Sequence, residues 1–217
     1  ANRFLEDFLP FQERVTRYGI YNSIAQVLLK VTAPGVPDVY QGSELWNFHL
    51  VDPDNRGPVD YAARVAILDD LRATLERIGP DRADFVRSLF EQPEDGRVKL
   101  LTLTLGLEQR RLRPDLFQRG DYLPLECGGS KKQHLCAFAR VHDQQSVITV
   151  VPRLVATLVP DAKQLPVGPS TWEDSWVATP PWPTLGESRH ILTGEIFRAE
   201  SVNGRRVLPL HKVFGHC

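Results

Sequence analysis

Residues 32–61 are TAPGVPDVYQGSELWNFHLVDPDNRGPVDY, and this stretch decides the predicted fold. An amphipathic helix is predicted over residues 2–31, in one or two pieces around Pro10, because apolar side chains recur there at helical spacing. A Pro-Gly pair ends this helix, and the short apolar segment at residues 36–40 is typical of a buried strand. A polar loop follows, and a second helical pattern begins after Asp60. Helix, strand, loop and helix together form one unit of a parallel α/β fold.

The loop after residue 40 has the chemistry of a site for a polyhydroxylated ligand. In parallel α/β folds, ligands bind at loops that leave the C-terminal ends of strands. Tyr40, Trp46 and Phe48 offer flat apolar faces to sugar rings. Hydrogen bonds to hydroxyl groups could come from Glu44, Asp52, Asp54, Asn55 and Arg56. Asp-Pro, Asp-Asn and Gly-Pro are also common in turns, so an acidic surface loop without a ligand remains an alternative.

Composition excludes several classes of protein. The chain has 217 residues, 42% hydrophobic and 24% charged, with a formal net charge of −1. Lysine and arginine are scattered, so nothing predicts binding to nucleic acid or to an anionic membrane. The longest mostly apolar run, residues 147–159, is too short to cross a bilayer, and the N-terminus has no basic region of a signal peptide. We therefore expect a cytoplasmic protein.

The cysteines predict neither disulfides nor a metal site. Cys127, Cys136 and Cys217 are odd in number and match no zinc spacing. His134 and His142 flank Cys136, but strand alternation explains this arrangement without a metal. No cofactor motif is present. The chain has no methionine and begins inside a predicted helix, so we expect a fragment cut at both ends.

A second helix is predicted over residues 61–78. Asp60 is a suitable N-cap, and Val65, Leu68, Leu71 and Leu75 share one helix face. Gly-Pro at positions 79 and 80 ends the pattern.

Two further helices are predicted before residue 120. A short one extends through Phe90, with Asp81 or Asp84 as its cap. Residues 98–113 give conflicting signals, since LTLTLGL alternates like a strand whereas the following EQRRLRP is a run of helix formers with a proline stop. We predict a helix there.

From Asp121 onwards the pattern changes to short β-rich runs separated by Gly, Pro, Asp and Asn-Gly turns. This pattern indicates an antiparallel sandwich or small barrel, with a domain boundary near Arg119 and Gly120. A hairpin turn is predicted at Asn203 and Gly204.

Three tryptophans in this part of the chain allow two interpretations. Trp172 and Trp176 are four residues apart, which would place both on one face of a strand. We expect that face to be buried, although together with Trp182 it could also stack on sugar rings.

The sequence motifs of residues 32–61 resemble those of a known enzyme family. GVPDVYQGSELW resembles the segment at the eighth barrel strand of the α-amylase family of glycoside hydrolases, with its Gly-x-Pro-x-x-Tyr-x-Gly-x-Glu pattern. The continuation LVDPDNRGPVDY resembles the maltooligosyltrehalose synthase family in particular, except that Gly57 stands where a second arginine is expected. GDYLPLE and TWEDSWVATP are similar to that family too.

The resemblance implies an α+β fragment from the C-terminal end of the longer enzyme. Residues 1–119 would be the mostly helical end of a (β/α)8 catalytic barrel, with one short barrel strand. Residues 120–217 would be a C-terminal antiparallel β-sandwich-like domain.

The resemblance also implies a function for the whole enzyme. It would convert the reducing-end α-1,4 bond of a maltooligosaccharide into an α,α-1,1 bond, as a retaining (1→4)-α-D-glucan 1-α-D-glucosylmutase without a cofactor. The loop would help hold the released glucose and exclude water. The alternatives are another α-amylase-family glucosyltransferase or hydrolase, a noncatalytic carbohydrate-binding module that uses the tryptophans, and a purely structural domain.

Site residues follow from matching motif positions. The family's catalytic acids follow barrel strands four, five and seven and would precede Ala1, so this chain is expected to hold none and to be inactive alone. The substrate wall would comprise Tyr40, Gln41, Glu44, Asp52, Asp54, Asn55 and Arg56. Among these, we expect Asp54 and Arg56 to be the main substrate contacts. The sequence leaves the oligomeric state open.

Overall fold

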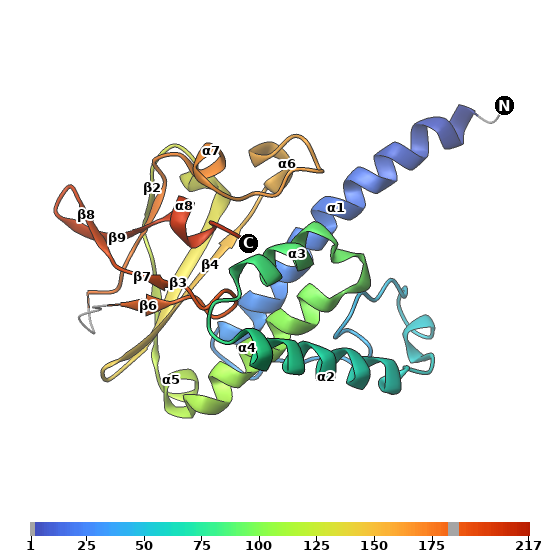
Figure 1. Ribbon diagram of the computed structural model, residues 1–217, viewed down its shortest axis with the longest axis horizontal. Coiled ribbons are helices and arrows are strands. Elements are labelled where there is room, and N and C mark those ends of the chain that lie inside the picture. The colour runs from blue at the N-terminus through green and yellow to red at the C-terminus, as the bar shows by residue number, and fades with distance from the viewer. Residues whose placement is uncertain (1–2, 182–186) are drawn as a thin grey trace.

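The computed structural model describes residues 3–181 and 187–217. Helices α1 to α4 gather on one side, and the β-strands with three short helices form the other (Figure 1). The N-terminal half of α1 projects away from both (Figure 1). Because α1 also packs along strand β4, the two parts share a contact surface.

Helix α1 (Arg3–Thr32) is a single helix that contains Pro10. Its buried residues begin at Ile20 and recur to Thr32, so only the second half packs on the rest of the chain. The prediction of a helix up to residue 31 is confirmed. Arg110 of α4 fixes the exit of α1, because its guanidinium donates to the Val31 carbonyl (3.0 Å) and the Gly35 carbonyl (2.6 Å). The first bond satisfies a carbonyl that the end of a helix leaves without an internal partner, and the second holds the segment just after the helix.

Helix α2 (Tyr61–Ile78) has the predicted bounds. The Asp60 carboxylate accepts a hydrogen bond from the Ala63 amide at 2.9 Å, so the predicted N-cap is confirmed. Gly79 ends the helix with a φ of +72°, a conformation that glycine adopts without strain.

Helix α3 (Ala83–Glu91) is present, but its predicted cap is wrong. The N-cap residue is Arg82, and no side chain caps the helix. The Arg82 amide donates to the Thr193 carbonyl at 3.2 Å, which joins the start of α3 to a distant turn. A single 3-10 turn, Pro93–Asp95, leads from α3 to the next helix.

Helix α4 (Arg97–Leu112) confirms the helix prediction where the pattern resembled a strand. Nearly every residue from Val98 to Gly106 is buried, because α4 lies between α1, α2 and α3. A helix that is buried all round carries apolar residues on every face, and this produces the misleading alternation. The short helix α5 (Pro114–Gln118) follows.

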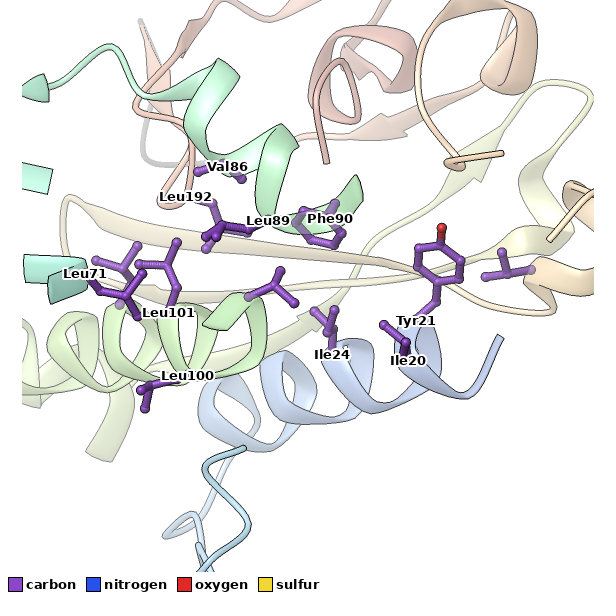
Figure 2. Close-up of a cluster of buried hydrophobic side chains, with 13 residues drawn as sticks. Ile20, Tyr21, Ile24, Leu71, Val86, Leu89, Phe90, Leu100, Leu101 and Leu192 are labelled. Atoms are coloured by element: carbon purple, nitrogen blue, oxygen red, sulfur yellow. The ribbon is translucent and has the colours of Figure 1, made fainter. Parts of the chain in front are cut away.

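The main hydrophobic core lies among these helices (Figure 2). Leu71, Val86 and Leu101 are at most 2% exposed and come from three different helices. Leu192 from the β-rich part completes the cluster, which explains how the two parts hold together.

One predicted strand is absent. Residues 36–40 are irregular, and Val36 is 94% exposed. A strand needs a hydrogen-bonded neighbour, and no strand in the described ranges pairs with this segment. The strand prediction is therefore wrong for this structure.

The first sheet has the order β1-β3-β4, with β1 at Asp121–Pro124, β3 at Leu135–His142 and β4 at Gln145–Pro152. Both pairings are antiparallel, as predicted. Arg140 is buried in β3 and donates to the Phe117 carbonyl (3.0 Å) and the Gly120 carbonyl (2.7 Å), which ties this sheet to the end of α5.

The second sheet has the order β2-β5-β9-β8. Its strands are β2 (Cys127–Gly128), β5 (Trp176–Ala178), β9 (Arg205–Pro209) and β8 (Glu200–Val202). All its pairings are antiparallel. The predicted hairpin at Asn203 and Gly204 joins β8 to β9, and both residues have positive φ, at +51° and +76°. Asn-Gly favours such turns, so this prediction is confirmed.

The remaining elements are short. They are β6 (Ser188–Arg189), β7 (Ile196–Phe197), α6 (Val155–Leu158), α7 (Pro169–Trp172) and α8 (Leu210–Val213). Strands β6 and β7 form a separate antiparallel ribbon.

Candidate functional site

The candidate site lies in the loop between α1 and α2. The loop encloses an open cavity of about 480 Å³. Its lining combines aromatic, amide and charged side chains: Gln41, Gly42, Trp46, Asn47, Phe48, His49, Asn55, Gly57, Pro58, Val59, Asp60 and Arg64. This volume lies within the range of roughly 300–1,000 Å³ that is typical of small-molecule sites.

Two of the seven predicted substrate contacts, Gln41 and Asn55, line this cavity. The Asn55 side-chain oxygen is buried and has no hydrogen-bond partner among the described residues. A buried acceptor without a partner is unfavourable by roughly 1–3 kcal/mol, so a small shift of the loop that gives this oxygen a donor would be stabilising. Gly57, which stands where the family pattern has arginine, also borders the cavity.

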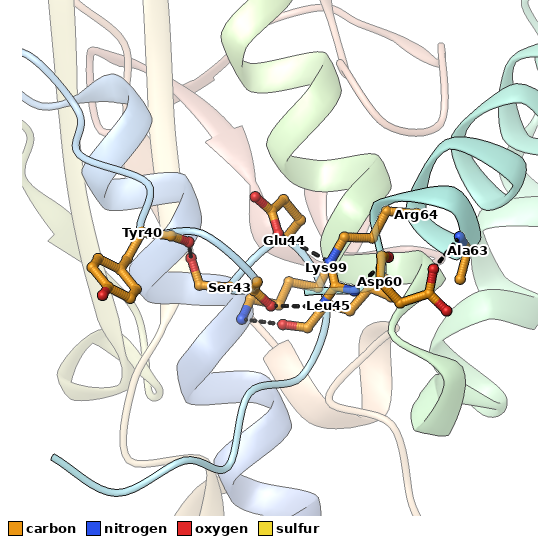
Figure 3. A network of polar contacts seen from close by, with 9 residues as sticks. Tyr40, Ser43, Glu44, Leu45, Asp60, Ala63, Arg64 and Lys99 are labelled. Atoms are coloured by element: carbon orange, nitrogen blue, oxygen red, sulfur yellow. Dashed lines mark hydrogen bonds and ion pairs between the residues drawn. The ribbon is translucent and has the colours of Figure 1, made fainter. Parts of the chain in front are cut away.

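Arg64 on α2 stabilises residues 42–44, which lie at one wall of the cavity. Its Nε lies 3.2 Å from Glu44 Oε2, and its two terminal nitrogens donate to the Asp60 carbonyl (2.9 Å) and the Gly42 carbonyl (3.0 Å). Figure 3 shows Arg64 reaching from α2 to Glu44 in the loop. The predicted substrate contact Glu44 is therefore the ion-pair partner of Arg64, and it is not part of the cavity lining.

Lys99 on α4 contacts the next residues at this wall, Leu45 and Trp46. It is 8% exposed, and its Nζ donates to the Leu45 carbonyl at 2.9 Å. The ammonium also lies 5.4 Å from the centre of the Trp46 ring, within the range of a cation–π contact. Burial lowers the pKa of Lys99, with Lys30 adding to this effect and Glu44 opposing it.

Trp46 is further fixed by its indole nitrogen, which donates to the Pro93 carbonyl at 2.7 Å. Ring and nitrogen thus have partners on two separate elements, so Trp46 presents a fixed edge to the cavity. Phe48 borders the cavity as well and is 81% exposed. A fixed indole beside an exposed phenyl ring provides apolar surface of the kind on which sugar rings stack.

Asp52, Asp54 and Arg56 lie next to the cavity, but their side chains contact the loop itself. Arg56 forms an ion pair with Asp52, with a second bond of 3.0 Å from its terminal nitrogen. Asp54 accepts a hydrogen bond of 2.6 Å from the Leu50 amide. Their expected role as the main substrate contacts stays a prediction, because in this structure they stabilise the fold of the loop.

Tyr40 is half-exposed, and Figure 3 shows its ring pointing away from the Glu44–Arg64 pair. Its carbonyl accepts hydrogen bonds from the Ser43 amide (3.0 Å) and hydroxyl (2.6 Å), which closes the turn that leads into the cavity. Its predicted contact with substrate also stays a prediction.

The tryptophans of the β-rich part do not share a strand face. Trp172 is in helix α7, whereas Trp176 is in strand β5, so that prediction is wrong. The short helix arises because Gly168 and Pro169 start a helical turn. Trp172 is fully buried and donates to the Pro166 carbonyl at 2.8 Å, as the burial interpretation expected. Trp182 lies outside the described residues.

No metal or membrane feature is found in the part of the chain that the structure describes. Within it, no three His, Cys, Asp or Glu side chains are grouped as metal ligands. The helices of residues 3–181 and 187–217 are too short or too polar to cross a membrane.

Arg64 and Lys99 are the site residues that sequence reasoning missed. Arg64 falls within a predicted helix and Lys99 within a segment of conflicting pattern, so neither drew attention. The sequence did hold a signal for Arg64. It is four residues after the predicted N-cap Asp60, so its side chain lies one helical turn along α2 and above the loop that leads into this helix.

Comparisons with known proteins agree with the predicted resemblance. No protein-family profile matches the chain. A provisionally named maltooligosyl trehalose synthase of Mycobacterium tuberculosis is 35% identical over 157 residues, 71% of this chain and 17% of that protein. The maltooligosyltrehalose synthase of Arthrobacter ramosus is similar in structure over the whole chain, with a TM-score of 0.74 and 30% identity. The chain matches one part of the maltooligosyltrehalose synthases.

The match is to a minor part of these longer proteins. The chain spans 17% of the Mycobacterium protein and 24% of the Arthrobacter structure. A synthase structure from Sulfolobus tokodaii is also similar, with a TM-score of 0.56, 25% identity, and coverage of 96% of this chain and 22% of the other. The predicted resemblance to maltooligosyltrehalose synthases is therefore confirmed, and these shares fit a fragment of such an enzyme.

Proposed function

We propose that this chain is a C-terminal segment of a maltooligosyltrehalose synthase, and that its 40–60 loop forms part of the wall of the glucan site. The whole enzyme would rearrange the reducing-end α-1,4 bond of a maltooligosaccharide into an α,α-1,1 bond in the cytoplasm. Residues 1–119 would belong to the end of the catalytic barrel, and residues 120–217 would form a sandwich-like β-domain. The similarity to the synthases supports this proposal.

One observation carries the role of the loop. The side chains of Gln41, Asn55, Trp46 and Phe48 line the same cavity, which brings amide groups and aromatic rings together. A sugar ring needs this combination, because its faces are apolar and its hydroxyl groups are both donors and acceptors.

The carboxylates of the loop support a binding role over a catalytic one. Retaining glycoside chemistry needs two carboxyl groups about 5 Å apart, one to attack carbon and one to transfer a proton. Here Glu44 pairs with Arg64, Asp52 pairs with Arg56, and the Asp54 and Asp60 carboxylates each accept an amide hydrogen. Side chains engaged in this way hold the loop, so the nucleophile and the acid would come from another part of the longer enzyme.

In the enzyme, the loop would keep the released glucose in place until it is transferred. Rotation of a held glucose lets its 1-hydroxyl attack the glycosyl-enzyme intermediate, whereas an open site would admit water and give hydrolysis. A rigid wall that excludes water favours transfer for this reason.

Calorimetric titration with maltohexaose tests the binding role directly. We expect heat of binding from the chain, and a loss of affinity of about tenfold in Asn55→Ala, the size of one hydrogen bond of about 1.4 kcal/mol. Gln118→Ala, at an exposed position at the end of α5, is the matched control and should bind as the parent chain does. Equal affinity of Asn55→Ala and Gln118→Ala would refute the placement of the glucan in this cavity.

A further inference from the structure

A second cavity, of about 390 Å³, lies between α2, α4 and the segment around Ile191. It shares no lining residue with the loop cavity. Its floor is made of leucines, of which Leu71 and Leu101 are each 2% exposed and Leu105 is 7% exposed. The leucines give this cavity an apolar surface, and its polar lining groups include Thr104 and Gln109.

The lining of this cavity is cationic. Arg72, Arg82, Arg113 and Arg189 contribute to it, against only Glu76 and Glu108, which leaves an excess of two positive charges. Within the described residues, none of these four arginines forms an ion pair. Guanidinium groups that outnumber the carboxylates of a cavity attract an anion.

Arg82 is partly buried. Its terminal nitrogen reaches the Ile191 carbonyl only at 3.5 Å, and its Nε is buried without a partner among the described residues. The pKa of Arg82 is lowered by burial, with Glu108 opposing this effect and Arg189 adding to it. Arg82 and Arg189 both line this cavity. A buried donor without a partner beside a second cation is unfavourable, and a bound oxyanion would relieve both problems.

The wall that carries Arg189 is firmly held. The Arg189 guanidinium donates to the Gly194 carbonyl at 3.0 Å. Gly194 packs so closely on the α2–α3 connection that a Cβ at this position would lie 1.8 Å from the Pro80 carbonyl oxygen. The two arginines are therefore presented by chain segments in direct contact, and binding would require little rearrangement.

We propose that this cavity binds a small organic carboxylate with an apolar chain or ring. The carboxylate would bridge the Arg82 and Arg189 guanidinium groups, and the apolar body would lie on the leucine floor. The volume falls in the range of ligand pockets, roughly 300–1,000 Å³. This site is independent of the proposed glucan-binding role of the loop.

Calorimetry with octanoate, an eight-carbon carboxylate, tests the proposal. We expect octanoate to bind the chain more tightly than octanol, which has the same apolar body without the charge. Arg82→Gln and Arg189→Gln should each weaken octanoate binding about tenfold or more, because each removes one charge-assisted contact. Arg119→Gln, an exposed arginine outside this cavity, is the control and should leave the affinity unchanged.

Three results would overturn the proposal. Octanol binding as tightly as octanoate would show that the arginines attract no carboxylate. Inorganic phosphate binding as tightly as octanoate would show that the leucine floor contributes nothing. The Arg189 side chain is exposed, although it donates to the Gly194 carbonyl. Provided that thermal melting shows Arg189→Gln to be folded, unchanged octanoate affinity in this variant would also refute the site, even if Arg82→Gln failed to fold.

Discussion

Replacing Arg64 by alanine removes the side chain that ties the 40–60 loop to α2. The guanidinium makes one ion pair, to Glu44 at 3.2 Å, and two hydrogen bonds to the Asp60 and Gly42 carbonyls at 2.9 and 3.0 Å. The side chains of Arg64 and Glu44 are only 19% and 25% exposed, so water does not fully replace these contacts.

The expected magnitude follows from these three contacts. A net value of about 1 kcal/mol for each carbonyl bond, and about 1 kcal/mol for a partly exposed ion pair, gives a loss of about 3 kcal/mol in Arg64→Ala. Arg64→Lys should fall between the two, because an ammonium keeps the charge but lacks the planar fork that reaches three acceptors.

Equilibrium urea denaturation measures this loss, and amide hydrogen exchange of residues 40–60 shows whether it is confined to the loop. Arg77→Ala, at an exposed position on the same helix, is the matched control and should change stability by less than about 0.5 kcal/mol. If Arg64→Ala were as stable as Arg77→Ala and the loop amides exchanged no faster, Arg64 would not hold the wall of the site.

Three further predictions concern the frame of the molecule. A Cβ on Gly106 would lie 2.6 Å from a valine methyl of α1, so Gly106→Ala should destabilise the chain by roughly 1–3 kcal/mol in urea denaturation. Gly19 in α1 has open space around it, so Gly19→Ala should stabilise the chain by about 0.5–1 kcal/mol. Equal effects of the two substitutions would contradict the packing of α4 on α1. Burial lowers the pKa of His190 to about 4, so the folded state binds a proton at this side chain less readily than the unfolded state does. The free energy of unfolding should therefore fall as the pH drops from about 6.5 to about 4. If thermal melting of His190→Gln showed the same pH dependence as the parent chain, His190 would not be its cause. Burial raises the pKa of Cys217 to about 12, so iodoacetamide at pH 8 should modify the exposed Cys136 faster than the partly buried Cys217, as mass spectrometry of peptides would show. Equal rates would contradict the packing of the C-terminal segment.

Much of the helical part could be predicted, because its signals are local. Asp60 before an apolar stripe and Gly79 after it gave both ends of α2. The Asn203-Gly204 hairpin was predictable for the same reason, since both residues adopt positive φ and few other pairs do so readily.

The failures share a different cause. The strand at residues 36–40 needs neighbouring strands, and the start of α3 is bonded to a turn more than 100 residues away, at Thr193. Trp172 is in a short helix because of the turn at Gly168, which has a φ of +80°, and not because of its own preference. Such outcomes depend on long-range packing that a single sequence does not display.

The candidate site was predictable as a segment but not as an arrangement. The motif located the loop and named Gln41 and Asn55, both of which border the cavity. It could not show that Glu44 faces Arg64 or that Lys99 lies beneath Trp46, because these partners are 20 and 53 residues apart from them in the chain.

The most direct test of the central claim is an assay of reducing ends with maltohexaose, because an α,α-1,1 bond consumes one reducing end for each molecule converted. The Arthrobacter ramosus synthase serves as the positive control. We predict that this chain leaves the number of reducing ends unchanged while the control lowers it, since the catalytic carboxylates would lie outside these 217 residues. Loss of reducing ends with this chain alone would contradict that account and place the catalytic pair among the acids within it.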